Sequence, residues 1–352
     1  MKIFMLIKRL RYSGAYKMFM WVANALAKKG HEVTVFTYMN SDVEELPEKI
    51  RWIKADLENS GLVKIVKETR RQIKDSGADV SISFLLDANI INTLACIGTK
   101  TKSIICERND PFKPHYYKLL FTKWMFRFAN GAVFQLPKVA EFYSMIKGPT
   151  AVIPNPVIPA AERIETGPFE KRENIIVSLG RLDIFQKRQD ILLNAFARFL
   201  KGHPDYKLYL FGDGPDEEKL RLLANELGIT EAVCFKGITN SPLQELSKTK
   251  FFVMTSDFEG IPNSLIEAMS IGLPCISTDC RPGGARLLIE NGKSGIIVPP
   301  GDANKLCEQM EYLTDNPQTA DKLGEEAAKS LIRFSEAEIT DKWDRYLKQV
   351  TI

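Results

Sequence analysis

The chain has 352 residues, of which 45% are hydrophobic and 26% are charged. This composition is ordinary for a soluble globular protein, and the length allows about two domains of usual size. The net charge of +4 is too small to indicate nucleic-acid binding, but it permits a basic patch that faces phosphates or an anionic membrane.

The cysteine pattern indicates a reducing compartment, and the first residues bear on targeting to a membrane. None of the six cysteines forms a C-x-x-C pair, so neither a metal cluster nor a disulfide framework is expected. The opening MKIFMLIKRL has an apolar run of only five residues before Lys8, which is too short for a signal peptide or a membrane span. We therefore expect a soluble, cytoplasmic protein that is at most peripheral on the inner face of the plasma membrane.

The first half of the chain opens as a strand, a glycine-containing loop, a helix and a second strand. These segments are KIFMLI (2–7), RYSGAY (11–16), KMFMWVANALAKKG (17–30) and HEVTVFTY (31–38). Apolar residues run continuously through the strands, which predicts a parallel sheet that is covered on both faces.

The segment HYYKLLFTKWMFRFANGAVF (115–134) has helical periodicity and allows two interpretations. It is either a helix that faces the core with a solvated rim, or a surface where cations meet anionic lipid and aromatic rings lie at headgroup depth. The apolar arc consists of Leu120, Phe121, Trp124, Met125 and Phe128, and the polar residues near it are Lys113, Tyr116, Lys118, Lys123 and Arg127.

A similar opening recurs from residue 174, where NIIVSLG reads as a strand, RLDIFQKRQ as a loop, DILLNAFARFLKGH as a helix and YKLYLFGDG as a strand. Two such series in one chain predict two Rossmann-like domains. Prolines at 154, 156, 159 and 168 mark a linker between them. We place an N-terminal domain at 1–155, the linker at 156–173, a C-terminal domain at 174–335 and a last helix at 336–352.

A candidate ligand site lies in the C-terminal domain, where the strand FFVMT leads through the loop SDFEGI into the helical pattern PNSLIEAMSIG (262–272). Open α/β sheets bind ligands at the carboxyl ends of their strands, and a helix N-terminus attracts phosphate. Gly260 lets the backbone approach a ligand, and Asn263 and Ser264 add hydrogen-bonding groups.

Two carboxylates frame this loop, because Glu259 and Glu267 stand with seven residues between them. Neither can neutralise a phosphate, but each can accept hydrogen bonds from hydroxyls. A ligand with hydroxyls on both sides of a diphosphate is a nucleotide-sugar. The spacing alone does not decide the matter, since a solvated loop glutamate and a surface helix glutamate would look the same.

Two cations follow another strand. Arg181 and Lys187 stand six residues apart after NIIVSLG, on the same predicted sheet edge. They could bind a diphosphate and stabilise its charge as it leaves, or they could be an exposed loop pair.

Several segments together resemble the retaining glycosyltransferases of the GT-B fold, specifically the large bacterial family 4. GRLDIFQKRQDILLNAF is similar to the G-R-x5-K stretch of that family, and FEGIPNSLIEAMSIGLPCIST is similar to its E-x7-E motif. LYLFGDGP, GKSGIIVPPGD and the crossing VIPNPV add to the resemblance, which is dense from about residue 152 to residue 302. It implies two Rossmann-like domains facing a cleft, with the C-terminal helix crossing back to the N-terminal domain.

The resemblance also implies roles for single residues. Glu259 would bind hydroxyls of the donor sugar, and Glu267 would bind the ribose. Arg181 and Lys187 would bind the diphosphate. The further donor-binding residues are Asn263, Ser264 and Leu265 through their amides, Gly260 in the loop, Gly212 near the base, and Gly14 near the diphosphate, where Ser13 replaces the first glycine of a pair found in the family.

The acceptor side departs from the family, whose members often carry a histidine near the reacting centre. The corresponding run here is CERND (106–110), and the nearest histidine is His115. Glu107, Arg108 and Asn109 are the acceptor-side candidates.

The activity expected is transfer of a hexose or N-acetylhexosamine from a UDP-sugar to a glycan or a polyprenyl-diphosphate-linked saccharide, with no metal and no other cofactor. A UDP-sugar epimerase of the same fold and a catalytically silent sugar-nucleotide-binding protein stay open as alternatives. A nicotinamide dehydrogenase is disfavoured, since no G-x-G-x-x-G follows the first strand.

Overall fold

The computed structural model describes residues 1–10, 14–43, 45–108, 116–157, 164 and 166–351. The chain forms two compact units. The N-terminal domain comprises Met1–Pro156 with Glu336–Ile352, and the C-terminal domain comprises Val157–Ser335. The stretch that the sequence marks as a linker is counted with the C-terminal domain from Val157 onward.

The N-terminal domain is built on a seven-stranded parallel sheet in the order β3-β2-β1-β4-β5-β6-β7. The chain builds outward in one direction from β1 and then in the other from β4, so the strand order reverses between these two strands. The strands are β1 Lys2–Ile7, β2 Glu32–Thr37, β3 Ile50–Lys54, β4 Val80–Phe84, β5 Lys102–Glu107, β6 Gly131–Phe134 and β7 Thr150–Val152.

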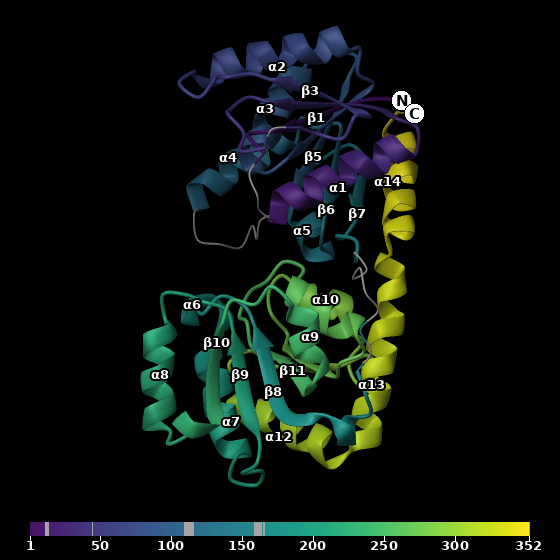
Figure 1. Cartoon of the computed structure of the whole chain (residues 1–352). Helices are drawn as coiled ribbons and strands as arrows, with labels where there is room; N and C mark the ends of the chain where they lie inside the picture. The colour runs from purple at the N-terminus through teal and green to yellow at the C-terminus, as the bar shows by residue number, and fades with distance from the viewer. Residues whose placement is uncertain (11–13, 44, 109–115, 158–163, 165, 352) are drawn as a thin grey trace. The chain divides into compact units, whose positions relative to one another are not determined.

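Alternate residues of β1 face two separate cores, as the period of a strand requires. Ile3 and Met5 pack with residues of α1 and α14, whereas Phe4 and Leu6 pack with residues of α2 and α3. The sheet is therefore covered on both faces, as the continuous apolar strands predict (Figure 1). The helices are α1 Gly14–Lys28, α2 Leu62–Ser76, α3 Leu86–Cys96, α4 Tyr116–Phe126, α5 Pro137–Phe142 and α14 Glu336–Thr351.

The last helix, α14, packs in the N-terminal domain, which confirms the predicted crossing of the C-terminal helix (Figure 1). Trp343 is 1% exposed within the core shared with α1. The hydroxyl of Tyr346 donates to the carbonyl of Pro149 at 2.9 Å, and Trp21 Nε1 donates to Glu336. Burial of its apolar face explains why this segment is a helix here.

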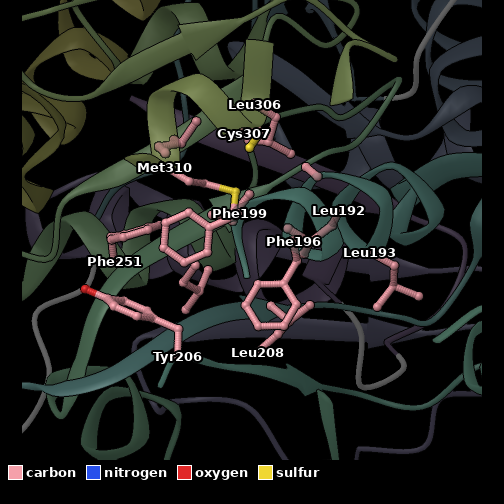
Figure 2. Close-up of a cluster of buried hydrophobic side chains, with 14 of the residues drawn as sticks. Leu192, Leu193, Phe196, Phe199, Tyr206, Leu208, Phe251, Leu306, Cys307 and Met310 are labelled. Carbon is pink, nitrogen blue, oxygen red and sulfur yellow. The ribbon is translucent and has the colours of Figure 1, made fainter. Parts of the chain in front are cut away.

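The C-terminal domain has a six-stranded parallel sheet in the order β10-β9-β8-β11-β12-β13. Leucine and phenylalanine side chains of α7 pack between the sheet and α12 (Figure 2). The strands are β8 Glu173–Leu179, β9 Lys207–Phe211, β10 Val233–Gly237, β11 Thr249–Met254, β12 Cys275–Thr278 and β13 Ile296–Val298. The α-helices are α6 Ile184–Lys187, α7 Gln189–Phe199, α8 Glu217–Glu226, α9 Pro242–Ser247, α10 Asn263–Ser270, α11 Gly284–Leu288, α12 Ala303–Asp315 and α13 Pro317–Ser330, and short 3₁₀ turns span Phe169–Lys171, Thr230–Ala232 and Leu331–Phe334.

The structure corrects the sequence analysis of residues 115–134. The helix α4 ends at Phe126, so Phe128 lies beyond it, and residues 131–134 form β6. Met125 is buried, but Phe121 and Trp124 are each 54% exposed and Phe128 is 45% exposed. The interpretation of this apolar arc as wholly core-facing is therefore wrong for these three rings. Lys113 lies outside the described residues.

None of the helices in the described part of the chain is long and apolar enough to cross a bilayer.

Candidate functional site

Two loops of the C-terminal domain meet at the point where its strand order reverses. β8 and β11 are hydrogen-bonded neighbours although other strands and helices separate them in the sequence. After β8, Arg181 lies in a loop and Lys187 is the last residue of the short helix α6, whereas Glu259 lies in the loop after β11. Ligands of open α/β sheets bind outside the carboxyl ends of strands at such a reversal.

Lys187 and Glu259 form an ion pair between these loops. Their side chains are 19% and 14% exposed, and Ser256 Oγ lies 3.5 Å from the same glutamate oxygen, Oε1. A cation and a carboxylate thus stand at one point at the sheet edge. This arrangement suits a ligand in which a phosphate adjoins sugar hydroxyls, since the cation binds the phosphate and the carboxylate accepts from the hydroxyls.

Further hydrogen bonds join the two loops. The amide of Asp257 donates to the carbonyl of Gln186 at 2.9 Å, and Gln186 Nε2 donates to the carbonyl of Phe258 at 3.1 Å. Thr255 Oγ1 donates to the carbonyl of Lys187 at 2.9 Å. The relative positions of Lys187 and Glu259 are therefore fixed by the backbone as well as by their own contact.

Close backbone approaches around the site require glycine. A Cβ atom at Gly212 would overlap the carbonyl oxygen of Gly180, and the φ of +125° at Gly212 also disfavours any L side chain. A Cβ atom at Gly284 would overlap the carbonyl oxygen of Gly260. The loops that carry the candidate residues are therefore packed directly against neighbouring backbone.

The N-terminus of α10 has amides that no side chain caps, and its first turn has no acidic residue. Among the predicted residues there, Leu265 is buried, Ser264 and Glu267 are half-buried and Asn263 is exposed. Free amides and the helix dipole make this end favourable for an anion.

Arg181 is exposed and forms no ion pair with any residue that the structure describes. Its carbonyl accepts a hydrogen bond from Nε2 of the buried Gln189 at 2.8 Å, which anchors the backbone while leaving the guanidinium available.

The acceptor-side candidates lie at the carboxyl edge of the N-terminal sheet. Glu107 ends β5 and is 2% exposed. One of its oxygens accepts from the amide of Arg108 at 3.0 Å, and the other from Asn89 Nδ2 at 3.5 Å. Glu107 is thus largely enclosed, which limits its direct contact with a ligand.

Arg108 is the better exposed of the two. Its Nη1 donates to Asn155 Oδ1, which also accepts from Gln135 Nε2 at 2.7 Å. Its guanidinium lies 4.6 Å from the ring centre of Phe84, and its buried Nε has no partner in the described structure. Burial lowers the pKa of Arg108 to about 10, so it stays charged at neutral pH.

The two remaining predicted residues are Asn109 and Gly14. Asn109 lies outside the described residues. Gly14 is the first residue of α1, after the first strand of the N-terminal domain.

Sequence reasoning missed several residues that shape these sites. Gly180 and Gly284 stand in the G-R and P-G-G stretches, and the glycines themselves were a signal of close backbone approach. Gln135 and Asn155 follow β6 and β7, but nothing local connects them with Arg108.

Within the described residues, no group of three or more His, Cys, Asp or Glu side chains is placed to hold a metal ion.

The chain is similar to several known sequences. Residues 161–330 match the family model described as Glycosyl transferases group 1. An uncharacterized glycosyltransferase of Methanocaldococcus jannaschii is 28% identical over 269 residues, which are 68% of this chain and 66% of that protein, so the chain spans just under two thirds of its length. A Campylobacter jejuni transferase, named as an alpha-1,4-N-acetyl-D-galactosaminyltransferase acting on a diNAcBac-PP-undecaprenol-linked glycan, is 28% identical over 363 residues, which are 99% of both chains.

Solved structures show the same fold. The lipopolysaccharide outer core galactosyltransferase WaaB superposes with a TM-score of 0.81 at 20% identity, over 99% of both chains. HepE from Anabaena, in complex with UDP and glucose, gives a TM-score of 0.77 at 18% identity, also over 99% of both chains. The chain therefore has the GT-B fold, and its residues 161–330 are similar to the Glycosyl transferases group 1 family.

Proposed function

We propose that the protein is a retaining, metal-independent glycosyltransferase of family 4. It moves a hexose or N-acetylhexosamine from a UDP-sugar to a hydroxyl of a glycan or a polyprenyl-diphosphate-linked saccharide. The observation that carries the proposal is the Lys187–Glu259 pair at the strand-order reversal of the C-terminal sheet, in which Lys187 ends α6 and Glu259 lies on the loop that leads into α10. The complex of the structural neighbour HepE with UDP supports the choice of nucleotide.

Donor binding follows from the charges at this edge. The amides of Asn263, Ser264 and Leu265 and the guanidinium of Arg181 bind the diphosphate, because they present donors and positive charge. Glu259 accepts from the sugar hydroxyls and Glu267 from the ribose. The backbone near Gly212 receives the base.

Transfer breaks the bond between the anomeric carbon and the diphosphate oxygen, and its electron pair leaves with UDP. The acceptor oxygen forms the new bond on the same face of the sugar, and its proton passes to an oxygen of the leaving diphosphate. Lys187 and Arg181 stabilise the negative charge that develops on this leaving group, which is the task a metal ion performs in other enzymes.

The acceptor belongs to the N-terminal domain in this proposal. Arg108, held by Asn155, presents a cation to an acceptor phosphate, and Glu107 lies enclosed behind it. The undecaprenol-diphosphate-linked substrate named for the Campylobacter jejuni relative supports an acceptor of this class.

The protein binds the inner face of the plasma membrane through one face of the α4 region. Phe121, Trp124 and Phe128 form a row of exposed rings, with centroid separations of 6.4 and 5.3 Å. Lys123 and Arg127 stand within this row in the sequence and provide positive charge. Aromatic rings with adjacent cations favour an anionic lipid interface.

The first test is calorimetric titration with UDP, GDP and ADP in the presence of EDTA. UDP should bind to the wild type, and Arg181→Ala and Glu267→Ala should weaken it by about 1.5–3 kcal/mol each, as expected for loss of a charged hydrogen-bond partner. Lys219→Ala, which removes an exposed lysine on α8, is the matched control. Absence of nucleotide binding, or equal effects of all three substitutions, would contradict the donor site.

The second test separates the reactions. Wild-type protein with UDP-hexose or UDP-N-acetylhexosamine and a polyprenyl-diphosphate saccharide should yield UDP and a glycoside with the donor's anomeric configuration, read by proton NMR. Turnover of the donor without acceptor to an isomeric UDP-sugar would instead identify an epimerase. Binding without turnover would identify a silent sugar-nucleotide-binding protein.

A further inference from the structure

Arg188 has a backbone conformation that is unusual for its side chain. It lies between α6 and α7 with φ 52° and ψ 41°, in the left-handed region. Among the described non-glycine residues, only Leu85 and Arg188 have positive φ. A branched or long L side chain is strained there, and glycine is not. Such strain persists only where the surroundings hold the residue in place.

The guanidinium of Arg188 joins two carboxylates from different loops. Nε and Nη2 each donate to one oxygen of Asp190 at 3.0 Å, and Nη1 donates to Oδ2 of Asp257 at 3.0 Å. Three bonds of this geometry need a planar, forked donor, which lysine does not have. The two carboxylates raise the pKa of Arg188 above its usual value, and the largest cause is the hydrogen bonding of its guanidinium to Asp190.

Arg188 is connected to both members of the candidate catalytic pair, Lys187 and Glu259. Lys187 is its neighbour in the chain, and Asp257 stands two residues before Glu259. The Arg188–Asp257 contact therefore links the residue next to Lys187 with the loop of Glu259 by side chains. The amide of Asp257, which donates to Gln186, links the same two loops by backbone.

We propose that Arg188 is a positioning residue: its guanidinium, held between Asp190 and Asp257, fixes the loop of Glu259 against the turn of Lys187. The inference rests on the proposed role of Lys187 and Glu259 in sugar transfer. It adds that the strained backbone at Arg188 is tolerated because this side chain sets the geometry of that pair.

The test exploits the fact that glycine removes the side chain and the strain together. Arg188→Gly should keep or raise the melting temperature, yet lower kcat for transfer from the UDP-sugar between about 10- and 100-fold, as small misplacements of reacting groups do. Arg188→Ala should lose as much kcat as Arg188→Gly does. It should also melt at a lower temperature than Arg188→Gly, because alanine stays strained in the left-handed backbone conformation and glycine does not. The KM for the donor should change less than kcat.

Asp257→Asn weakens the contact between Arg188 and Asp257 and leaves the backbone at Arg188 unchanged. It should therefore also lower kcat. The double variant R188G/D257N should have the same kcat as R188G, because both substitutions remove the same Arg188–Asp257 contact. Glu217→Gln is the matched control, because Glu217 accepts two hydrogen bonds from Arg221 on α8, away from these loops. It should leave kcat unchanged.

Wild-type kcat in R188G, or additive losses in the double variant, would overturn the positioning role while leaving the proposed transfer intact. A melting temperature that falls in D257N and R188G with kcat unchanged would show a purely structural contact and overturn it as well. If the wild type transfers no sugar, the proposed function fails and the positioning role fails with it.

Discussion

Lys187 Nζ donates a hydrogen bond to Glu259 Oε1 across 72 residues of sequence, at the carboxyl edge of two neighbouring parallel strands. Each side chain is mostly enclosed, and each balances the charge of the other. A donor that brings a diphosphate to the lysine and hydroxyls to the glutamate can replace this contact, because the diphosphate pairs with the cation and the hydroxyls donate hydrogen bonds to the carboxylate. In the proposed function, the pair would couple recognition of the phosphate to recognition of the sugar.

Substitutions in the Lys187–Glu259 pair should distinguish its contribution to stability from its contribution to activity. Lys187→Met should lower kcat by about 10²–10³-fold, because a cation that stabilises the leaving group is lost. It should also lower the free energy of unfolding by about 1–3 kcal/mol, since Glu259 is left enclosed without its cation. Steady-state kinetics and urea unfolding measure the two effects. The double variant K187M/E259Q should regain much of the stability but none of the activity. Recovery of activity in the double variant would argue against the proposed roles.

Gly284 should tolerate no side chain. Gly284→Ala places a methyl group on the carbonyl oxygen of Gly260, next to Glu259. We expect a loss of about 1–3 kcal/mol in the free energy of unfolding, as overpacking costs, together with weaker donor binding. Gly202→Ala is the control, because the nearest atom to its Cβ lies at 3.8 Å. Equal stability of the two variants, measured by urea unfolding, would contradict the close approach.

The exposed rings near α4 should govern binding to membranes. Replacing Phe121 and Trp124 with serine should reduce co-sedimentation with phosphatidylglycerol vesicles at least several-fold and leave UDP binding unchanged, because the rings lie in the N-terminal domain. Leu222→Ser, at a residue 59% exposed on α8, is the matched control. The proposed membrane contact would be refuted if the wild-type protein did not bind such vesicles, or if all variants bound them equally.

Asp344 should contribute to the loss of stability in acid. Its pKa is lower than usual, first because Lys348 donates to it and also because His31 does. The unfolded carboxyl therefore binds a proton more readily than the folded one, so its stabilisation is present above its ordinary pKa of 3.8 and is lost as pH falls through the lower folded value.

Unfolding by urea at a series of pH values tests this linkage. Asp344→Asn should be less stable than wild type at pH 7 and should show a flatter decline around and below pH 4. Asp341→Asn on the same helix, whose carboxylate is 53% exposed, is the control and should keep the wild-type slope. Parallel declines in wild type and Asp344→Asn would contradict the assignment.

The sequence by itself determined the architecture and the kinds of residue at the donor site. Strands such as Lys2–Ile7 and helices such as Gln189–Phe199 follow from periodicities that act over a few residues, so they are readable locally. The same holds for the order strand–loop–helix that puts Glu259 before α10. The local pattern does not predict the short strands β12 and β13, because runs of three or four residues carry little periodicity.

Only the tertiary structure decided which of these residues meet. The neighbouring positions of β8 and β11 bring Lys187 to Glu259 and Arg188 to Asp257, and no local pattern encodes strand order. It also decided that Phe121 and Trp124 face outward while Met125 is buried, since neighbouring elements, and not the helical wheel, select the covered arc. Hydrogen bonding and periodicity act over short stretches of chain, whereas ion pairs and burial depend on segments that only folding brings together.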